Sequence, residues 1–300
     1  MTGATGFIGQ RLVSELLEND YRVQAMVRPE KTTDKRLPQS CEQVPVSLTD
    51  VTRLAGIVAE SSAVIYCAGS VRGRSSADFA LANIEGVRAM LKALEQSANP
   101  PPMLLLSSLA ASKPQLSDYA RSKYEGEQLL HGKPSLPWTI IRPPAVYGPG
   151  DKEMLPLLKM IRRGFLVHPG PPDQRLSLLH VDDLAAAVSS CLSAFQNCLH
   201  GTYAIDDGRP GGYGWQDIGD AVSERKFRVL KLPDFLLEGS ARMNLLFSKV
   251  LGYSPMLTAG KVRELKEAEW LCDNGDFMHA TGWKPKLDLK RGAEQLFSTL

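Results

Sequence analysis

The 300-residue chain lacks long hydrophobic runs and an excess of charge of either sign. No apolar stretch reaches the roughly 18–20 residues that a helix needs to cross a bilayer. Lys and Arg number 35 and Asp and Glu number 33, which leaves a formal net charge of +2. This balance does not favour nucleic acid or an acidic membrane surface as a partner.

Cysteine is also scarce, with five residues at positions 41, 67, 191, 198 and 272. The count is odd, and no pair has the spacing of a zinc site or a redox motif, so we expect neither a disulfide framework nor a bound metal. Arg11 and three glycines interrupt any segment near the amino terminus that would resemble a signal peptide. These absences favour a reduced, cytoplasmic protein.

Short apolar runs alternate with longer amphipathic stretches, the pattern of a parallel sheet covered by helices. We expect Asp50 and Asp118 to cap helices, and Pro100-Pro101-Pro102 to end one. The predicted strands are Tyr21–Arg28, Val44–Ser47, Ala63–Gly69, Met103–Ser108 and Trp138–Pro143. The predicted helices are Phe7–Asn19, Val51–Glu60, Ala77–Ser97 and Tyr119–His131. This order predicts an α/β fold with a doubly wound (Rossmann) parallel sheet.

The composition of the sequence changes after Gly148, where Gly and Pro become frequent and the segments with periodic hydrophobicity become shorter. We expect residues 1–150 to form the dinucleotide-binding core and residues 179–206 to return to it, as helix Asp182–Ala194 and strand Thr202–Ile205. Residues 151–178 and 207–300 would form a smaller substrate-binding lobe. Its apolar stretch Met243–Leu257 is interpreted as a helix, with docking on a membrane as a minor alternative.

A glycine-rich stretch, Gly3-Ala4-Thr5-Gly6-Phe7-Ile8-Gly9, stands almost at the start of the chain. Glycines allow a tight turn close to a pyrophosphate, and the amphipathic helix that follows offers free N–H groups. Because a helix and then a strand follow, the motif predicts a dinucleotide site. The strand that should lead into the loop is reduced to Met1-Thr2, so we expect the first strand to be truncated and the natural protein to begin several residues upstream.

The expected second strand ends at Val27-Arg28 rather than at an acidic residue. An acid at this position would bind the ribose hydroxyl of NAD, whereas an arginine suits the 2′-phosphate of NADP. Lys31, Lys35 and Arg36 add positive charge nearby. The pattern favours NADP over NAD, although Arg28 would also fit as an ordinary surface residue.

Tyr119 and Lys123 are four residues apart, which places them on one face of the predicted helix. A nearby ammonium lowers the pKa of a phenol, which can then exchange a proton with a carbonyl or hydroxyl group. The pair follows the strand that ends in Ser107-Ser108, at the edge of the sheet where open α/β folds bind ligands. The position indicates a catalytic pair.

Taken together, these motifs resemble the extended short-chain dehydrogenase/reductase family, which includes the NAD-dependent epimerases/dehydratases. The resemblance extends over nearly the whole chain. It rests on Thr2–Gly9, Asp50-Val51, Cys67-Ala68-Gly69, Asn83 with Gly86, Ser107-Ser108, Tyr119 with Lys123, Arg142-Pro143-Pro144-Ala145-Val146-Tyr147-Gly148 and His180-Val181-Asp182-Asp183.

The resemblance implies that Tyr119 is the general acid/base, that Lys123 holds the nicotinamide ribose and tunes Tyr119, and that Ser108 binds the substrate oxygen, with Ser107 as the fallback. In His180-Val181-Asp182-Asp183 we expect an aspartate to cap the next helix and His180 to bond the backbone. The expected cofactor contacts are Gly3, Thr5, Gly6, Phe7, Ile8, Gly9, Arg28, Asp50, Val51, Cys67, Ala68, Gly69, Tyr119, Lys123, Pro143 and Val146.

Two features depart from many relatives. Ser108 and Tyr119 are only 11 residues apart, so the loop that helps to wall the active site is short, and the site is either open or walled by the second lobe. Ala145 stands where nucleotide-sugar epimerases typically carry an asparagine, and its side chain has no hydrogen-bond donor. With Pro143-Pro144, this resembles the reductase and hydroxysteroid-dehydrogenase branch.

The leading hypothesis is an NADP-linked reductase of a ketone or dehydrogenase of a secondary alcohol, acting on a small and apolar substrate. The alternatives are an epimerase or dehydratase of a nucleotide sugar with tightly held NAD, and a non-catalytic accessory or regulatory protein. The expected partners are the small-molecule substrate and, as an open option, a second copy of the chain. Large apolar residues offered as substrate contacts are Met154, Phe165, Phe235, Met243, Phe247 and Tyr253.

Overall fold

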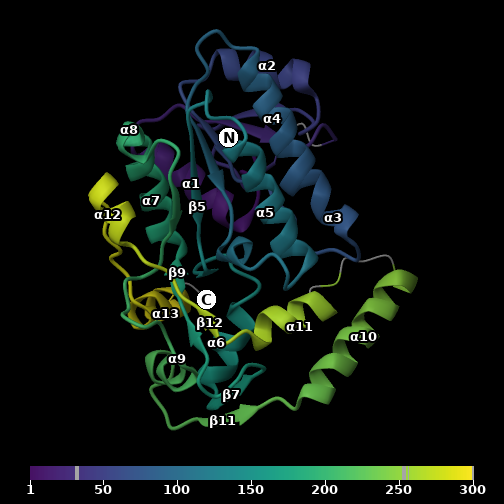
Figure 1. The fold of residues 1–300 in the computed structure, drawn as a ribbon. Helices are drawn as coiled ribbons and strands as arrows, with labels where there is room; N and C mark the ends of the chain where they lie inside the picture. Colours follow the sequence, from purple (N-terminus) through teal and green to yellow (C-terminus); the bar gives the residue numbers. More distant parts are fainter. Residues whose placement is uncertain (31–33, 252–254, 256, 299–300) are drawn as a thin grey trace.

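A parallel sheet with helices on both faces forms the upper half of the molecule in Figure 1. The computed structural model describes residues 1–30, 34–251, 255 and 257–298. One part of the sheet has the order β10-β5-β4-β3, and β1 pairs with β2 beside it. The strands are β1 (Gln24–Val27), β2 (Glu42–Pro45), β3 (Val64–Tyr66), β4 (Met103–Leu106), β5 (Trp138–Arg142) and β10 (Thr202–Ala204). All the pairings are parallel, which confirms the predicted doubly wound fold.

Met1 and Thr2 lie between β1 and β3. The amino group of Met1 donates to the Gln24 carbonyl (2.7 Å), and the Met26 amide donates to the Met1 carbonyl (2.8 Å). On the other side, the Thr2 amide donates to the Ile65 carbonyl (3.0 Å). These two residues therefore join the two parts of the sheet and lead directly into the glycine-rich turn.

Helices cover both faces of the sheet. One face packs against α1 and α7, and the other packs against α2, α4 and the end of α5. The bounds are α1 (Phe7–Glu18), α2 (Val51–Ala59), α3 (Ser76–Ala80), α4 (Gly86–Glu95), α5 (Asp118–His131), α7 (Val181–Ser193) and α8 (Phe195–Cys198). Apolar residues of α1 recur at helical spacing (Leu12, Val13 and Leu16), and all three are buried, which accounts for its amphipathic pattern.

The predicted helix Ala77–Ser97 is divided by a π-helical turn at Leu81–Glu85. In a regular helix the Gly86 amide would donate to the Ala82 carbonyl. The Tyr66 hydroxyl donates a hydrogen bond to the Ala82 carbonyl instead (2.7 Å), and the Gly86 amide donates to the Leu81 carbonyl. A Cβ at Gly86 would lie 2.1 Å from the Tyr66 oxygen, so only glycine admits this contact. The long-range bond from Tyr66 replaces a regular helical one.

The lower half of the molecule is built from three two-stranded parallel pairs and further helices (Figure 1). The paired strands are β6 (Ala145–Tyr147) with β9 (Leu178–His180), β7 (Phe165–His168) with β11 (Arg228–Lys231), and β8 (Arg175–Leu176) with β12 (Glu269–Trp270). The helices of this half are α6 (Leu155–Arg162), α9 (Trp215–Val222), α10 (Asp234–Leu251), α11 (Ala259–Lys266) and α13 (Leu289–Ser298), whereas α12 (Gly275–Thr281) lies beside α7 and α8. A separate core around Tyr147, Leu158 and Trp215 fills this half, whereas Phe277 and Trp283 pack against α1 and α7.

The described helices include none that is both long and apolar enough to cross a bilayer. All five cysteines are free in the structure. The predicted helix over Met243–Leu257 corresponds to the second half of α10, which ends at Leu251, and residues 252–254 and 256 lie outside the described part of the chain.

Candidate active site

The glycine-rich turn connects Thr2 to α1 and is held tightly by backbone contacts. Gly3 has a φ of +68°, and a Cβ there would lie 2.6 Å from the backbone of Cys67 and Ala68. A Cβ on Gly9 would lie 2.1 Å from the Gly3 carbonyl oxygen, so this glycine lets the helix pack against the turn. The Gly6 amide closes the turn onto the Gly3 carbonyl (3.0 Å).

Thr5, Gly6, Phe7 and Ile8 pass from this turn into the first turn of α1. Gly6 occupies the N-cap position and makes no side-chain cap, so no side chain of its own competes for the first N–H groups of α1. Such a helix start, preceded by close-packed glycines, fits a pyrophosphate. The residues present therefore suit the dinucleotide that the motif predicts.

The second predicted cofactor segment, Cys67-Ala68-Gly69, lies directly beside this turn. The Thr2 hydroxyl accepts hydrogen bonds from the amides of Cys67 (3.1 Å) and Ala68 (3.0 Å). A Cβ on Gly69 would lie 3.1 Å from the Asn83 amide oxygen and 3.7 Å from Lys123 Nζ. The glycine-rich turn and the segment after β3 thus lie side by side, and the second of them lies close to the lysine of the predicted catalytic pair.

Helix α5 carries Tyr119 and Lys123, and it begins one residue after Ser117. The Ser117 hydroxyl accepts a hydrogen bond from the Ala120 amide (2.9 Å), so Ser117 is the N-cap. The prediction that Asp118 caps this helix is therefore wrong: Asp118 is the first helical residue and is exposed. The nearly buried Ser117 hydroxyl fixes the start of the helix immediately before Tyr119.

The Tyr119 phenol lies beside the Ser108 side chain, whose hydroxyl accepts a hydrogen bond from the Ala110 amide (3.2 Å). Burial raises the pKa of Tyr119 to about 12; the nearby Ser108 hydroxyl lowers it in part, and the negative charge of Glu264 raises it further. The phenol is therefore held protonated at neutral pH, next to the hydroxyl of the serine that was expected to bind the substrate oxygen.

Lys123 is nearly buried, and its Nζ donates to the Leu106 carbonyl oxygen (2.8 Å). Burial lowers the pKa of Lys123 to about 8, against the charges of Cys67 and Glu127, which raise it. The expectation that this ammonium lowers the pKa of Tyr119 is not met here. Burial of the phenol is the largest effect on its pKa, and the lysine donates its hydrogen bond to the Leu106 carbonyl instead.

Ser107, the alternative candidate for the substrate-binding serine, bonds a different residue. Its hydroxyl donates to Glu127, which has no exposed surface. Glu127 also accepts two hydrogen bonds from Arg142, of 2.9 and 2.5 Å. Ser108 is the better candidate for the substrate-binding serine, since its side chain lies beside the Tyr119 phenol and the Ser107 hydroxyl is bonded to Glu127.

Helix α11 walls the site on the Tyr119 side. The Ser117 hydroxyl donates to Glu264, and the Arg263 side chain donates to the Leu116 carbonyl (2.7 Å). Gly260 lies so close that a Cβ there would be 2.8 Å from the Ser117 side chain. From the sequence, the short connection between Ser108 and Tyr119 allowed either an open site or one walled by the second lobe. In the structure, α11, a segment far along the chain, covers this connection.

The remaining predicted cofactor contacts lie around the same edge. Arg28 follows β1 and is exposed, while Asp50 caps α2 by accepting from the Arg53 amide (3.1 Å), as predicted, and Val51 opens that helix. The Pro143 carbonyl accepts from the Leu109 amide (2.8 Å) in the 3-10 helix Leu109–Ser112 that follows Ser108. Val146 lies in β6, which pairs with β9.

Two of the extra basic residues border a cavity of about 470 Å³ beside α1. Lys35 and Arg36 face Phe7 and Arg11 across it. Arg36 is bonded to Asp34 (2.8 and 2.5 Å), so part of its charge is already paired. Lys31 lies outside the described residues.

His180 caps α7, since its Nδ1 accepts from the Asp182 amide (3.3 Å). The prediction that His180 bonds the backbone is confirmed, and the prediction that an aspartate caps this helix is wrong. Asp182 instead pairs with Arg11 (2.7 Å), and Asp183 accepts from two backbone amides near residue 286. Both aspartates tie α7 to other segments.

The large apolar residues offered as substrate contacts do not form one group. Phe165, Phe235 and Met243 are half or more exposed on the outside of the lower half, whereas Met154 packs partly against its core. The side chain of Phe247 and all of Tyr253 lie outside the described residues. Size and hydrophobicity alone did not identify which of these residues face the site.

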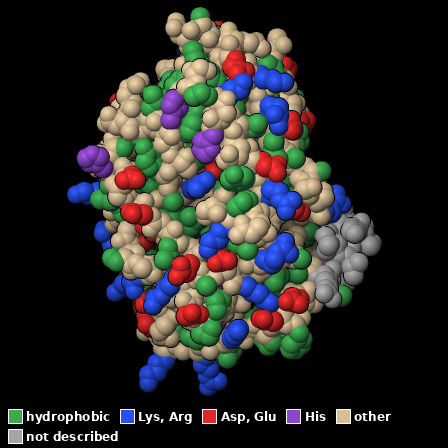
Figure 2. All heavy atoms as spheres, in the orientation of Figure 1, with side chains coloured by type: hydrophobic (Ala, Val, Ile, Leu, Met, Phe, Trp, Pro, Cys, Tyr) green, Lys and Arg blue, Asp and Glu red, His purple; other side chains and the backbone are tan. Residues whose placement is uncertain are grey.

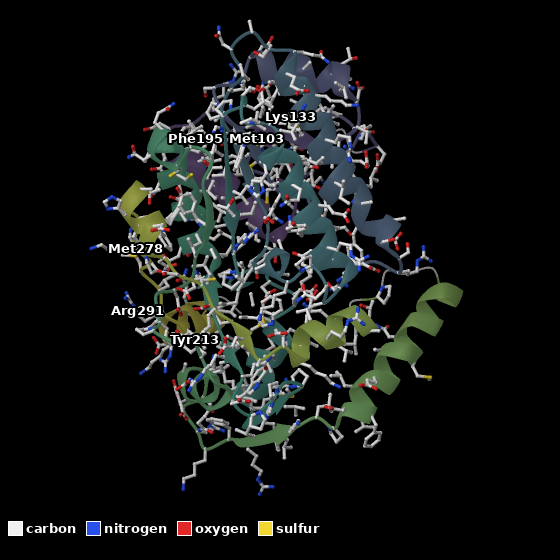
Figure 3. The ribbon with its side chains drawn as sticks, in the orientation of Figure 1. Met103, Lys133, Phe195, Tyr213, Met278 and Arg291 are labelled. Carbon is white, nitrogen blue, oxygen red and sulfur yellow. The ribbon has the colours of Figure 1, made fainter. Side chains whose placement is uncertain are left out.

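The sequence analysis missed two acidic residues beside the site. Glu127 stands one helical turn after Lys123, so its spacing on the predicted helix was a usable signal. Glu264 lies 147 residues from its partner Ser117, and nothing in the local sequence indicated that contact. In Figure 3, the labelled Met103 lies in the upper half of the molecule, with the sheet, and Tyr213 lies in the lower half.

Comparison with known proteins places these features in a family. Residues 1–205 match the model of the NAD dependent epimerase/dehydratase family. The ceramide reductase of Caulobacter vibrioides is 30% identical over an alignment that covers 95% of this chain and 96% of that protein. A mitochondrial NADH dehydrogenase subunit, alpha subcomplex subunit 9 of Dictyostelium discoideum, is 29% identical over 63% of this chain and 54% of its own length.

Among solved structures, the UDP-glucuronic acid 4-epimerase of Bacillus cereus in complex with UDP-glucuronic acid and NAD has a TM-score of 0.73. The superposition covers 99% of this chain and 96% of the epimerase chain, at 19% sequence identity. At this identity the likeness establishes the fold.

Proposed function

Because the chain belongs to the NAD-dependent epimerase/dehydratase family of extended short-chain dehydrogenases/reductases, we propose that it is an NADP-linked reductase of a ketone, or in reverse a dehydrogenase of a secondary alcohol. The observation that carries the proposal is the Tyr119 phenol beside the Ser108 side chain, with Lys123 buried one helical turn further along α5 at the same edge of the sheet. A protonated phenol beside a second hydroxyl suits the donation of a proton to a carbonyl oxygen.

In this mechanism Tyr119 donates its phenolic proton to the substrate oxygen, and the Ser108 hydroxyl donates a second hydrogen bond to the same oxygen as negative charge develops on it. When bound, the nicotinamide supplies the hydride in reduction and accepts it in oxidation. Lys123 would exchange its bond to the Leu106 carbonyl for contacts with the nicotinamide ribose, where its charge would stabilise the phenolate.

NADP is preferred over NAD in the proposal because Arg28, exposed directly after β1, occupies the position where an acidic residue would bind the ribose hydroxyl of NAD. The cofactor would rest on the turn from Gly3 to Gly9, with Asp50 and Val51 near the adenine. Titration with NADPH and NADH separately tests this preference. Arg28→Ala should weaken NADPH binding by about tenfold or more and leave NADH binding nearly unchanged, since an arginine–phosphate bond contributes roughly 1.5–3 kcal/mol.

An apolar substrate is favoured because Ala145 offers no hydrogen-bond donor in place of an asparagine, and because a relative over nearly the full length is a ceramide reductase. Residues 151–178 and 207–300 would supply the substrate-binding lobe, with α11 as the part that lies next to Tyr119.

The deciding experiment measures NADPH oxidation with a panel of long-chain ketones and NADP reduction with the matching alcohols. Tyr119→Phe should lower kcat by at least about 100-fold, the usual contribution of a positioned acid/base. Tyr124→Phe, on the same helix but half-exposed, is the control and should keep full activity. Equal activity of the wild type and Tyr119→Phe would contradict the mechanism.

A nucleotide-sugar epimerase is the second candidate, favoured by the match to the family model and by the fold shared with UDP-sugar epimerases. It predicts tightly held NAD that stays bound while the sugar isomerises, with no net release of reduced cofactor. A non-catalytic accessory protein is the third candidate, in line with the similarity to a respiratory-complex subunit. Undiminished biological activity of Tyr119→Phe would favour it over both enzymes.

A further inference from the structure

One end of the lower half carries apolar side chains that face solvent. Strand β11 is exposed at all four positions, and its partner β7 starts with Phe165, which is 50% exposed. In the parallel register Arg228 stands opposite Phe165 and Leu230 opposite Val167, so these four side chains share one face of the pair. A groove of about 580 Å³ separates this face from α6.

The next element along the chain extends the apolar surface. Helix α10 begins three residues after β11, and Phe235 (72% exposed), Leu236 and Met243 lie on one side of it. Leu237 and Ala241, on the opposite side, are buried against α11. The helix lies along the outside of the molecule in Figure 1, and the apolar side chains of its outer side remain largely exposed to solvent.

Positive charge surrounds this surface. Residues 159–163 and 224–238 contain seven Lys and Arg and three acidic residues, in a chain whose net charge is only +2. Two of the acidic residues, Asp234 and Glu238, are paired with Lys266. Figure 2 shows Lys and Arg side chains that project from the lower end of the molecule, where β11 lies in Figure 1, close to hydrophobic atoms.

We propose that this end, formed by α6, β7, β11 and the first half of α10, docks on an anionic lipid bilayer. Apolar side chains flanked by Lys and Arg are the composition that binds the boundary between headgroups and acyl chains. Phe165, Leu230 and Phe235 enter that boundary. Arg228 contacts anionic headgroups from the same face of the strand pair, and Lys231 reaches them from the opposite face. The docking surface is separate from Tyr119 and does not depend on the reaction catalysed.

The experiment is co-sedimentation of the whole protein with vesicles of phosphatidylcholine and phosphatidylglycerol, compared with vesicles of phosphatidylcholine alone. The wild type should bind the anionic vesicles, and added salt should weaken the binding. Arg228→Glu with Lys231→Glu should reduce the partition coefficient by about 30-fold or more. Phe235→Ser with Leu230→Ser should also reduce it, because buried apolar area is lost.

The matched control is Lys92→Glu with Lys284→Glu, which changes the net charge equally at two exposed lysines outside the docking surface. It should bind like the wild type, and circular dichroism should confirm that every variant is folded. Three results would overturn the proposal: no binding by the wild type, equal loss of binding in the control, or a dimer in solution that Phe235→Ser dissociates. The last would assign the surface to a second copy of the chain.

Discussion

The Ser117 hydroxyl donates a hydrogen bond to Glu264 from the position that caps helix α5, two residues before Tyr119. Both side chains are almost completely buried, and Lys261 pairs with the same carboxylate (2.9 Å). A carboxylate from α11 thus stands beside the proposed acid/base. Its negative charge raises the pKa of Tyr119 beyond the rise that burial causes.

Glu264→Gln should therefore lower the pKa of Tyr119. Alcohol oxidation requires the phenolate, so its rate should rise with pH at lower pH values in the variant than in the wild type, whereas ketone reduction should decline earlier. Rate profiles in both directions measure this shift. Glu238→Gln, which removes an exposed carboxylate from α10, should leave both profiles in place.

Buried Lys123 should make the stability of the cofactor-free protein depend on pH. Its pKa is about 8 in the folded chain and 10.5 in the reference state, so between these values the unfolded chain binds more protons and stability rises with pH. The penalty is fully present below pH 8 and amounts to about 3 kcal/mol. Lys123→Met should be more stable than the wild type at pH 7, by up to that amount, and the difference should shrink toward pH 10.

Urea unfolding at several pH values tests this relationship, with Lys92→Met as the exposed control. A difference between Lys123→Met and the wild type that does not change with pH would contradict the assignment. The same variant should be almost inactive, which would show that this lysine lowers stability in exchange for function.

Glycines 9 and 56 should respond to alanine in opposite ways. A Cβ on Gly9 would lie 2.1 Å from the Gly3 carbonyl oxygen, so Gly9→Ala must displace the turn and should cost about 1–3 kcal/mol. Gly56, inside α2, has no atom near that position, and Gly56→Ala should stabilise the protein by roughly 0.5–1 kcal/mol. Thermal unfolding checks both, and NADPH binding should weaken only in Gly9→Ala.

The buried pair of Glu127 and Arg142 should be costly to break. Glu127→Gln leaves the arginine without its charge partner, and we expect a loss of about 3 kcal/mol, at the low end for buried pairs because Arg142 is partly exposed. The exposed pair of Glu85 and Arg88 is the comparison, and Glu85→Gln should change stability by less than about 0.5 kcal/mol. Similar losses in both variants would contradict this account.

The core of the fold and much of the candidate site were predictable because their signals are local. The glycine spacing, the apolar strands and the four-residue spacing of Tyr119 and Lys123 all reflect backbone geometry within one or two elements. Ser117 and Asp118 were equally good caps by residue type, and only the structure distinguishes them. The π-helical turn depends on Tyr66 and the wall of the site on Glu264, both contacts between distant segments.

The contact between α11 and the start of α5 also affects how the protein is made. Ser117 emerges from the ribosome long before Glu264, which follows 147 positions later. A nascent chain can therefore form the glycine turn and the first strands, yet it cannot bring α11 against the start of α5 beside Tyr119 until nearly the whole polypeptide has been synthesised. Chemical competence is thereby postponed to the last stage of biosynthesis.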